Sequence, residues 1–291
     1  MKTKKTFLIT GVGGFIGFNI AKYYSKNNNV VGIYRKQKPK IKNIELIKID
    51  LSKKDLDIIL QKKKINIDIV IHCSSKTPES KYKSKNIYTN NISQMKNILK
   101  IKQKLIKFIF LSSVSVYGDV INTAYVSENY KGRNVNTYGK SKFECEKILE
   151  YFAKKNKVSS YAFRLPGVVG FFSHSNFMSI LLKKIKNKLE INLFNPNSKF
   201  NNIIHVDFLI EAIDFAINKK NNFSIFNLAS TFPIKLYKIV DILCKKFNYK
   251  GKIEWYKTRS DSFCISLNKA KRFGFKFKNT EQNIFRFISK N

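Results

Sequence analysis

Cysteines, acidic residues and long apolar runs are scarce in this 291-residue chain. Its four cysteines form no Cys-x-x-Cys pair, and no group of His and Cys has the spacing of metal ligands, so neither a disulfide framework nor a metal site is expected. Cysteines that form no disulfide are typical of proteins in the reducing cytoplasm, so a cytoplasmic location is expected. No stretch of about 18 apolar residues occurs, so we expect neither a transmembrane helix nor a membrane partner.

The shortage of acidic residues leaves a large positive charge. The chain has 56 Lys and Arg against 19 Asp and Glu, a formal net charge of +37, which raises the question of a nucleic acid or an acidic membrane as partner. However, only six of the 56 are Arg, and the lysines are scattered among many Asn and Ile, as in residues 91–110. This pattern indicates a bias toward A/T-rich codons, so no nucleic-acid partner is expected. The positive field still favours anionic ligands such as phosphates.

The first half of the chain alternates short, continuously apolar runs with amphipathic segments, and 43% of all residues are hydrophobic, which is enough for a sizeable core. Continuous apolar runs are typical of strands buried on both faces of a parallel sheet. The expected strands are residues 7–10, 30–34, 45–49, 67–73, 108–111, 161–165 and 223–228. The expected helices are residues 15–25, 54–62, 88–102, 140–155, 178–188, 206–218 and 234–247. This alternation predicts an α/β protein with a doubly wound parallel sheet.

The alternation becomes less regular after Pro166, and from residue 252 onward the pattern is mixed. No internal repeat and no linker rich in proline or glycine divides the chain, so we expect the second part to be interleaved with the first. Residues 1–166 are expected to form the larger domain, with elements near 203–229 returning to it. Residues 167–291 are expected to form mainly a smaller lobe.

A glycine-rich turn, within FLITGVGGFIG, joins the first expected strand to the first expected helix. Gly11 permits a tight turn, Gly14 lets the backbone approach a pyrophosphate, and Gly17 lets the helix pack closely on the strand. The start of the helix, at Phe15 and Ile16, presents free N–H groups to the phosphates. Such a turn alone is weak evidence, but its place between strand and helix predicts a nicotinamide dinucleotide site on a sheet of the Rossmann type.

The end of the second expected strand informs the choice of cofactor. NAD sites place Asp or Glu there to hold the ribose 2′-hydroxyl, whereas this strand ends in Tyr34, Arg35 and Lys36. Arg35 and Lys36 could neutralise a 2′-phosphate, which favours NADP over NAD. Alternatively, both are solvated side chains of a basic protein, so NAD stays open.

Tyr138 and Lys142 form a second pattern, at the start of a helix. Their i, i+4 spacing puts both side chains on one face, and a close ammonium and a positively charged nicotinamide favour the phenolate of a phenol whose ordinary pKa is about 10. The pair alone is weak evidence in so lysine-rich a chain. Upstream, however, the expected strand 108–111 continues into Ser112 and Ser113, and the carboxyl ends of strands face the ligand crevice of a doubly wound sheet. We therefore expect Ser113 to hydrogen-bond the reacting hydroxyl or carbonyl.

Together these motifs resemble the extended short-chain dehydrogenases/reductases that modify nucleotide-diphosphate sugars, the NAD-dependent epimerase/dehydratase family. The resemblance covers nearly the whole chain and includes VIHCS at 70–74, Asn91, RLPGVVG at 164–170, IHVD at 204–207, RSD at 259–261, NKA at 268–270 and FGF at 273–275. It implies a nucleotide-diphosphate sugar as partner, a homodimer, and a smaller lobe that binds the substrate.

The resemblance also implies roles for single residues. Ser113, Tyr138 and Lys142 would be catalytic, and Tyr138 and Lys142 would also contact the cofactor. Asn176 and Arg259 would contact the substrate, Arg259 at its diphosphate, although Asn176 could equally be a helix N-cap. The remaining cofactor contacts would be Gly11, Gly14, Phe15, Ile16, Gly17, Arg35, Asp50 and Leu51, with Asp50 near the adenine ring.

Three departures from the family bear on the reaction. The Arg often found before the IHVD stretch is Asn201 or Asn202 here, and the Asn often found after the sixth-strand Arg is Gly167. Directly after Ser113, where the family's sugar dehydratases have an acidic pair, stands Val114, which cannot do acid–base chemistry. Dehydration is therefore not expected, and hydride transfer at a sugar carbon remains, as in an epimerase or a ketoreductase.

Two other functions stay open: a dehydrogenase or reductase of a non-sugar substrate, and a family member without catalysis that senses nucleotides or binds RNA. His72 and His205 each lie in or beside an apolar strand, so we expect both to be core residues with satisfied hydrogen bonds. The aromatic residues in Phe171–Phe172 and in 273–277 are expected in the core, not as platforms for base stacking.

Overall fold

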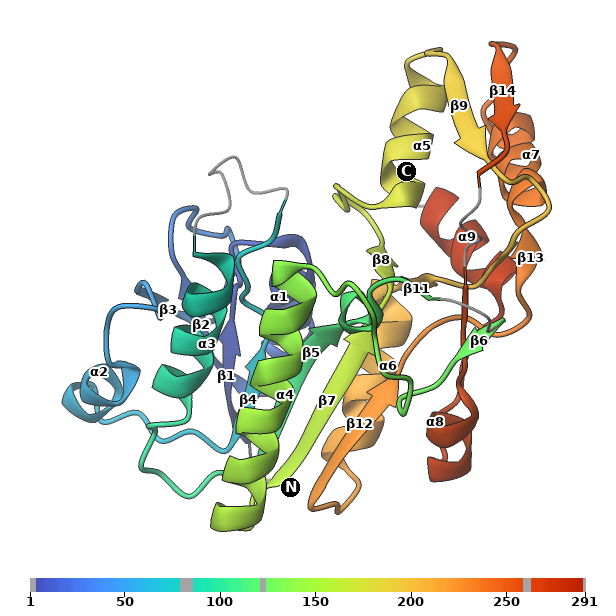
Figure 1. Ribbon diagram of the computed structural model, residues 1–291. Coiled ribbons are helices and arrows are strands. Elements are labelled where there is room, and N and C mark those ends of the chain that lie inside the picture. Colours follow the sequence, from blue (N-terminus) through green and yellow to red (C-terminus); the bar gives the residue numbers. More distant parts are fainter. Residues whose placement is uncertain (1–3, 79–85, 121–123, 259–262, 290–291) are drawn as a thin grey trace. The chain divides into compact units, whose positions relative to one another are not determined.

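The computed structural model describes residues 4–78, 86–120, 124–258 and 263–289 (Figure 1). The chain divides into two compact units that interleave along the sequence. Unit 1 consists of Met1–Asp119, Lys131–Arg164 and Ile213–Phe226, and unit 2 of Val120–Tyr130, Leu165–Ala212 and Asn227–Asn291. Among the helices of the described residues, none combines the length and the apolar character needed to cross a membrane.

Unit 1 is built on a sheet in which, within the described residues, seven strands follow the order β12-β7-β5-β4-β1-β2-β3. These strands are β1 (Thr6–Thr10), β2 (Asn29–Tyr34), β3 (Glu45–Lys48), β4 (Ile69–His72), β5 (Lys107–Ser113), β7 (Ser159–Leu165) and β12 (Phe223–Asn227). Strands β3, β2, β1, β4 and β5 pair in parallel, and the order runs outward in two directions from β1. The predicted doubly wound parallel sheet is thus confirmed, and the predicted strands differ from the observed ones only near their ends.

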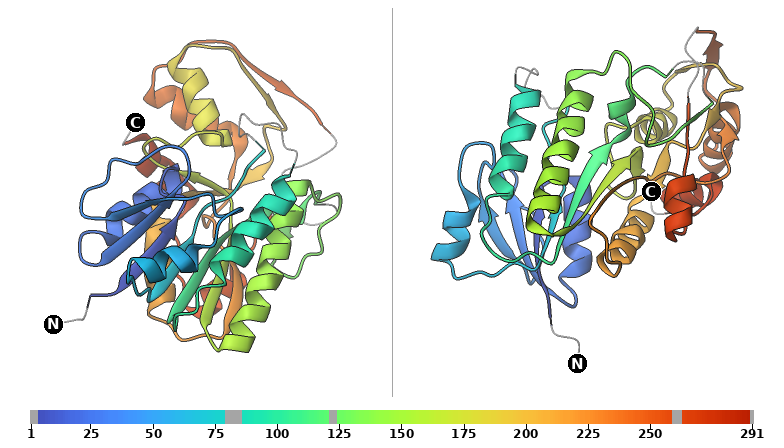
Figure 2. Two further views of the ribbon diagram at one scale, coloured as in Figure 1. Left: turned by 90° about the vertical axis from the view of Figure 1, so that its left-hand side faces the viewer. Right: turned by 60° about the horizontal axis from the view of Figure 1, so that its bottom comes forward.

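Helices cover both faces of this sheet. They are α1 (Phe15–Tyr24), α2 (Leu56–Lys62), α3 (Ile87–Ile98) and α4 (Thr137–Asn156), with the 3-10 helix η1 (Val114–Tyr117) directly after β5 and α6 (Val206–Ile217) crossing the boundary between the units. Helices α3 and α4 lie side by side on one face, and α1 lies on the other (Figures 1 and 2). The hydroxyls of Tyr23 and Tyr24 in α1 each donate to the carboxylate of Asp214 in α6, both at 2.6 Å.

The inner strands of the sheet are mainly apolar because both of their faces are buried. Every residue of β5 from Lys107 to Ser112 is buried, and Phe108 and Phe110 are 0% and 1% exposed. Leu149 of α4 belongs to the same hydrophobic cluster, at 0% exposure. Burial of large apolar side chains on the two faces is the main source of stability in such a layered unit.

Unit 2 has a core of its own, formed by helices and short strand pairs. Among its described residues, the parallel pairs are β8 (Gly167–Val169) with β11 (Ile203–His205), β9 (Ile191–Phe194) with β14 (Ile253–Tyr256), and β6 (Tyr125–Val126) with β15 (Cys264–Ile265). The antiparallel pair is β10 (Lys199–Phe200) with β13 (Ile234–Lys235), and the helices are α5 (Phe177–Lys186), α7 (Leu236–Lys246), α8 (Asn268–Phe273) and α9 (Thr280–Ile288). The elements after residue 252 were not predicted, since most are too short to show a hydrophobic period.

The expectation that Phe171 and Phe172 are core residues is wrong. They are 52% and 72% exposed, and their ring centroids lie 4.0 Å apart in the loop between β8 and α5. The backbone of Phe172 has a φ of 69°, which is the left-handed region. Apolar character alone does not tell which side of such a turn faces the core. In the segment 273–277, by contrast, Phe275 is 4% exposed.

Leu149→Ala should lower the free energy of unfolding by about 2–5 kcal/mol, because it leaves a cavity beneath α4 that the sheet cannot refill. Urea unfolding followed by far-UV circular dichroism measures the change. Tyr151→Ala is the matched control, since Tyr151 lies in the same helix and is 68% exposed; its effect should stay below about 0.5 kcal/mol. Equal losses in the two variants would contradict the assigned core.

Candidate active site

The glycine turn brings the end of β1 and the start of α1 unusually close together. Gly11 has a φ of +73°, and the amide of Gly14 donates to the carbonyl of Gly11 at 2.9 Å. A Cβ on Gly17 would lie 2.4 Å from that carbonyl oxygen, so only glycine fits there. Because α1 begins at Phe15, the first-turn amides of Phe15, Ile16 and Gly17 have no partner within the helix. This is the geometry that a phosphate requires.

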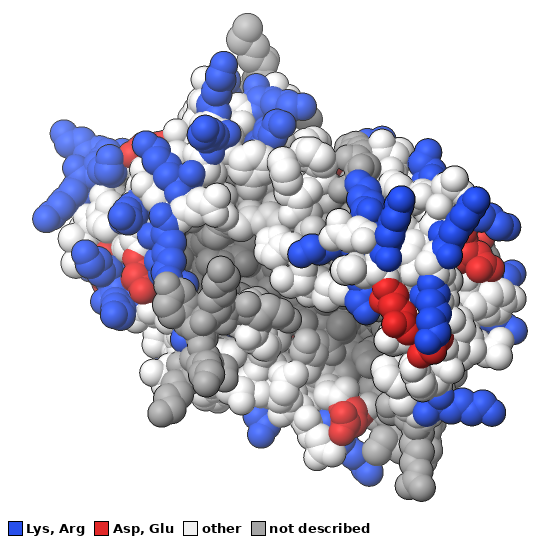
Figure 3. Space-filling model, turned by 90° about the horizontal axis from the view of Figure 1, so that it is seen from above, with Lys and Arg blue, Asp and Glu red and all other residues white. Residues whose placement is uncertain are grey.

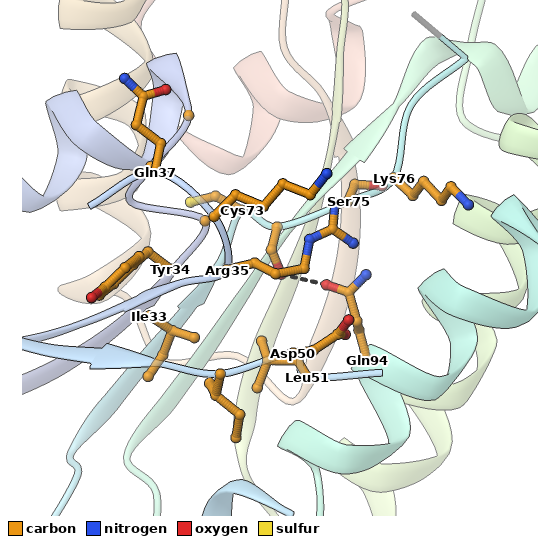
Figure 4. Close-up of a pocket in the computed structure, with 16 residues that line it drawn as sticks. Ile33, Tyr34, Arg35, Gln37, Asp50, Leu51, Cys73, Ser75, Lys76 and Gln94 are labelled. Carbon is orange, nitrogen blue, oxygen red and sulfur yellow. Dashed lines mark hydrogen bonds between the residues drawn. The ribbon is translucent and has the colours of Figure 1, made fainter. Parts of the chain in front are cut away.

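A pocket of about 360 Å³ opens beside this turn (Figure 4). Of the predicted cofactor contacts, the structure brings Gly11, Gly14, Arg35, Asp50 and Leu51 together around it. Five other predicted cofactor contacts do not line the pocket: Phe15, Ile16, Gly17, Tyr138 and Lys142. The glycine cradle, the free amides and the pocket volume together fit a dinucleotide.

Further residues of the pocket wall were not singled out from the sequence. Among the residues that line the pocket, these are Gly13, Ile33, Tyr34, Gln37, Ile49, Cys73, Ser74, Ser75, Lys76 and Gln94. Most follow the carboxyl ends of β2, β3 and β4, so the rule that ligands bind at strand ends could have found them. Gln94 is different, because it reaches the wall from α3 and accepts a hydrogen bond from the hydroxyl of Ser74 at 2.7 Å.

The pocket wall carries mainly positive charge. Arg35, Lys36 and Lys76 line it together with the carboxylate of Asp50. Burial by itself raises the pKa of Asp50, but the hydroxyl and amide hydrogen bonds from Ser52 outweigh it, followed by the charge of Arg35, so the pKa is lowered overall. Asp50 is therefore ionised at neutral pH and accepts hydrogen bonds, while the basic side chains offer charge to an anion.

Thr10, at the end of β1, holds the loop after β4 in place. Its hydroxyl oxygen accepts from the amides of Cys73 and Ser74, at 3.1 and 3.0 Å, and lies 2.8 Å from Nδ1 of His72. With two donors on its oxygen, the hydroxyl donates its own proton to Nδ1. Burial, and then the charge of Lys142, lowers the pKa of His72 to about 3. His72 is thus a neutral core histidine, as expected.

Ser113 stands at the carboxyl end of β5. Its hydroxyl accepts from the amide of Ser115 at 3.1 Å and caps η1, and it also lies 3.1 Å from the Ser115 hydroxyl. The structure therefore gives Ser113 a second serine, Ser115, as neighbour.

Helix α4 fastens the predicted catalytic pair to the same strand end. Lys142 is 3% exposed, and its Nζ donates to the carbonyl of Leu111 at 2.8 Å. The ammonium lies 4.7 Å from the ring centroid of Phe110 and 5.7 Å from that of Tyr138, which is half-buried. Ser113 lies two residues after Leu111, so Lys142, Tyr138 and Ser113 are gathered at one end of β5.

Asn91 of α3 connects this end of α4 to the pocket. Its side chain accepts from the amide of Lys76 at 2.8 Å and donates to the carbonyl of Lys76 at 3.2 Å. It also donates to the hydroxyl of Ser141 at 2.9 Å, which in turn donates to the carbonyl of Tyr138 at 2.7 Å. Hydrogen bonds thus connect the pocket wall at Lys76 to the start of α4.

Of the predicted substrate contacts, Ser113 lies in unit 1 and Asn176 in unit 2. Asn176 is the N-cap of α5: it accepts from the amide of Ser179 at 3.0 Å and donates to the carbonyl of Val168 at 3.0 Å. Arg259 lies outside the described residues. Asn201 is 2% exposed and hydrogen-bonds to Ser230 and Ile265, so it braces the core of unit 2 and offers no substitute for the missing Arg.

The basic residues do not form a single stripe on the face shown in Figure 3. Lys and Arg are scattered across it, and Asp and Glu are sparse. This distribution agrees with the compositional interpretation of the charge.

The chain matches the NAD dependent epimerase/dehydratase family over residues 7–229, and it belongs to this family. It is thus an enzyme of the class that acts on nucleotide sugars with a nicotinamide cofactor. The resemblance stated from the glycine turn, the strand-end serines and the Tyr138–Lys142 pair is confirmed at the level of the family.

Individual relatives agree with this placement. The chain is 27% identical over 237 residues to ADP-L-glycero-D-manno-heptose-6-epimerase of Brachyspira hyodysenteriae, covering 76% of this chain and 74% of that protein. Its fold matches UDP-N-acetylglucosamine 4-epimerase from Methanobrevibacter ruminantium, in complex with UDP-N-acetylmuramic acid, with a TM-score of 0.81, 22% identity and full coverage of both chains. It also matches UDP-glucuronic acid 4-epimerase from Bacillus cereus, in complex with UDP-glucuronic acid and NAD, with a TM-score of 0.80, 21% identity and 98% coverage of both.

His72→Asn should make stability less sensitive to acid. The pKa of His72 is about 3 in the folded protein against an ordinary 6.5, so below about pH 6.5 the unfolded chain takes up a proton that the folded protein does not. The folded state then loses about 1.4 kcal/mol per pH unit until about pH 3. Asn keeps an acceptor near the position of Nδ1 and does not titrate.

Urea unfolding at pH 7, 6 and 5 measures this difference. The free energy of unfolding should fall more steeply in the wild type than in His72→Asn, while His174→Asn, at an exposed histidine, should follow the wild type. Parallel curves for the wild type and His72→Asn would contradict the neutral, buried assignment.

Proposed function

We propose that the protein is an NAD(P)-dependent epimerase or ketoreductase of nucleotide-diphosphate sugars, with Tyr138 as the acid/base. The observation that carries the proposal is the arrangement at the end of β5. There the buried ammonium of Lys142 is fastened to the Leu111 carbonyl, beside the Tyr138 ring and close in sequence to Ser113. Complexes of related structures with UDP-glucose and with UDP-glucuronic acid support a sugar nucleotide as substrate.

The cofactor would be held by the glycine turn and the pocket beside it. The first-turn amides of Phe15, Ile16 and Gly17 would bind its pyrophosphate, and Asp50 and Leu51 would flank its adenine ring. Arg35 and Lys36 would neutralise a 2′-phosphate, which favours NADP over NAD. When bound, the nicotinamide supplies the acceptor or donor of the hydride at the sugar carbon.

The protein's own groups would move the proton and hold the reacting oxygen. Tyr138 as phenolate would take the proton of the sugar hydroxyl while its carbon is oxidised, and would return it when the ketone is reduced. The ammonium of Lys142 would stabilise the phenolate. Ser113 would donate a hydrogen bond to the reacting oxygen. Val114, in place of an acid, leaves no group there to expel water, so we propose hydride chemistry without dehydration.

The remaining roles follow the family resemblance. We propose that residues 1–166, with the elements near 203–229, bind the cofactor, and that residues 167–291 mainly bind the substrate. Asn176 and Arg259 keep their proposed contacts with the substrate, and the cap that Asn176 forms is compatible with one further hydrogen bond. A homodimer and a cytoplasmic location complete the proposal.

Tyr138→Phe should lower kcat by at least about 100-fold, since proton transfer by a positioned side chain contributes about 10²–10⁴-fold. Nicotinamide cofactor binding, followed by fluorescence, should change by less than about threefold. Tyr151→Phe, at an exposed tyrosine of the same helix, is the control and should match the wild type in both. Turnover of Tyr138→Phe near the wild-type rate would overturn the assignment.

Replacing both Arg35 and Lys36 by Ala should weaken NADP binding by about 10- to 100-fold, because charge-assisted contacts to a phosphate contribute about 1.5–3 kcal/mol. NAD binding should change little. Calorimetric titration with the two dinucleotides measures this, with the exposed Lys48→Ala as control. Tighter binding of NAD than of NADP by the wild type would contradict the preference.

The dinucleotide that co-purifies with the protein distinguishes the two reactions. An epimerase regenerates its cofactor in each cycle, so tightly held NAD would support epimerisation. A reductase must exchange its cofactor, so an empty site that prefers NADPH would support reduction.

A further inference from the structure

One turn after Lys142, helix α4 carries a carboxylate that the chemistry proposed above does not use. Glu146 is 1% exposed, and it pairs with Arg164 of β7, which is 3% exposed. The pair is bidentate: Nε and NH2 of Arg164 donate to the two carboxylate oxygens at 3.0 and 2.7 Å. Such a pair has a fixed, planar geometry.

The same pair is bound to the end of β5 and to η1. The hydroxyl of Ser112 donates to Glu146 at 2.5 Å, and NH1 of Arg164 donates to the hydroxyl of Tyr117 at 3.2 Å. Tyr117 is fully buried at the end of η1. Glu146 and Arg164 thus connect four elements: β5, η1, α4 and β7. They do so at Ser112, the residue directly before Ser113.

Two successive residues of β5 are therefore tied to two successive turns of α4. Lys142 holds the Leu111 carbonyl and Glu146 holds the Ser112 hydroxyl. Tyr138 precedes Lys142 by one turn on the same helix face. These two hydrogen bonds therefore fix the position of Tyr138 along the direction of β5. Sliding α4 along β5 would break both.

The charge of the pair also matters to this site. An unpaired carboxylate at position 146 would weaken the positive potential that Lys142 creates. The positive charge of Arg164 cancels the negative charge of Glu146. Burial by itself lowers the pKa of Arg164, but the hydrogen bonds and charge of Glu146 outweigh this and raise it, so Arg164 stays charged. Near Lys142, burial lowers the pKa of His72 and raises the pKa of Cys73 and of Cys145, so these three described groups are uncharged at neutral pH.

We propose that the buried Glu146–Arg164 pair is a positioning device of the active site. It locks α4 against the end of β5 so that Tyr138 and Ser113 face one reacting oxygen, and it removes a negative charge that would weaken the action of Lys142 on Tyr138. The inference rests on the proposed roles of Ser113, Tyr138 and Lys142. Stability alone does not require such a pair, because apolar side chains of the same volume serve at least as well in many cores.

Glu146→Gln tests the proposal, since it removes the charge and keeps an acceptor for Ser112, while its amide nitrogen leaves Arg164 with one acceptor fewer. The variant leaves Arg164 of β7 as an uncompensated positive charge beside position 146, which lies eight residues after Tyr138 on α4, about 12 Å along the helix axis at 1.5 Å each. At an effective dielectric constant of about 20, this should shift the titration of Tyr138 downward by about half to one pH unit. NMR of tyrosine labelled with ¹³C at the ring ζ position reports the titration, with the Tyr138 signal assigned by its loss in Tyr138→Phe.

Two further variants separate charge from position. Adding Arg164→Gln to Glu146→Gln restores a neutral pair, so the Tyr138 titration should return to the wild-type position while kcat stays lower by about tenfold or more with KM within about threefold. Glu150→Gln is the matched control one turn further along α4, because Glu150 is exposed and pairs with Lys154 at 2.7 Å. It should leave the titration and kcat unchanged.

The outcomes are distinguishable from those of the proposed function. If the wild type turns over no sugar nucleotide, the proposed function fails, and the Tyr138 titration still decides this inference. If Tyr138 titrates in Glu146→Gln as it does in Glu150→Gln, or if Glu146→Gln retains the wild-type kcat, the positioning role is overturned. If Glu146→Gln does not fold, Ser112→Ala is the alternative, because it removes one hydrogen bond of the same network. Ser112→Ala should lower kcat by about three- to tenfold without changing KM. An unchanged kcat in this variant would also overturn the positioning role.

Discussion

The hydrogen bond from the buried ammonium of Lys142 to the carbonyl of Leu111 sets the geometry on which the candidate site depends. A buried charge is costly unless it is well bonded, so α4 cannot move along β5 without losing this contact. The helix therefore carries Tyr138 to the strand end where Ser113 stands. The chemistry proposed for this protein is a consequence of that docking and not of any one side chain.

A second constraint acts at the carboxyl end of β1. Gly11 and Gly17 approach so closely that a Cβ on Gly17 would collide with the Gly11 carbonyl. The approach places the start of α1 beside the end of β1, and Thr10 holds the loop after β4 through the amides of Cys73 and Ser74. Asn91 then joins that loop to the start of α4. The pocket and helix α4 are parts of one hydrogen-bonded framework.

Polar groups buried in this framework have distinct tasks. His72 is kept neutral beside Lys142, so it contributes a hydrogen bond without adding a second positive charge. Glu146 and Arg164 are both charged, but each cancels the other. The net effect leaves the ammonium of Lys142 as the charge nearest Tyr138 among the described contacts of that ring.

The sequence by itself determined the class of the fold and its family. Continuous apolar runs and helical periods are local patterns, so the strands of the sheet were placed to within a residue or two. The glycine turn is equally local, because its spacing and its place between a strand and a helix decide its geometry. Arg35 and Asp50 could be named since both follow strand ends.

Only the tertiary structure decided which side chains meet. Gln94 reaches the pocket from α3, Asn201 serves the core of unit 2 in place of a phosphate contact, and Phe171 and Phe172 are exposed where a core position was expected. The Glu146–Arg164 pair joins residues 18 positions apart on different elements. Such contacts depend on how elements pack, which no local pattern records, because hydrophobic periodicity shows that a face is buried and not what it is buried against.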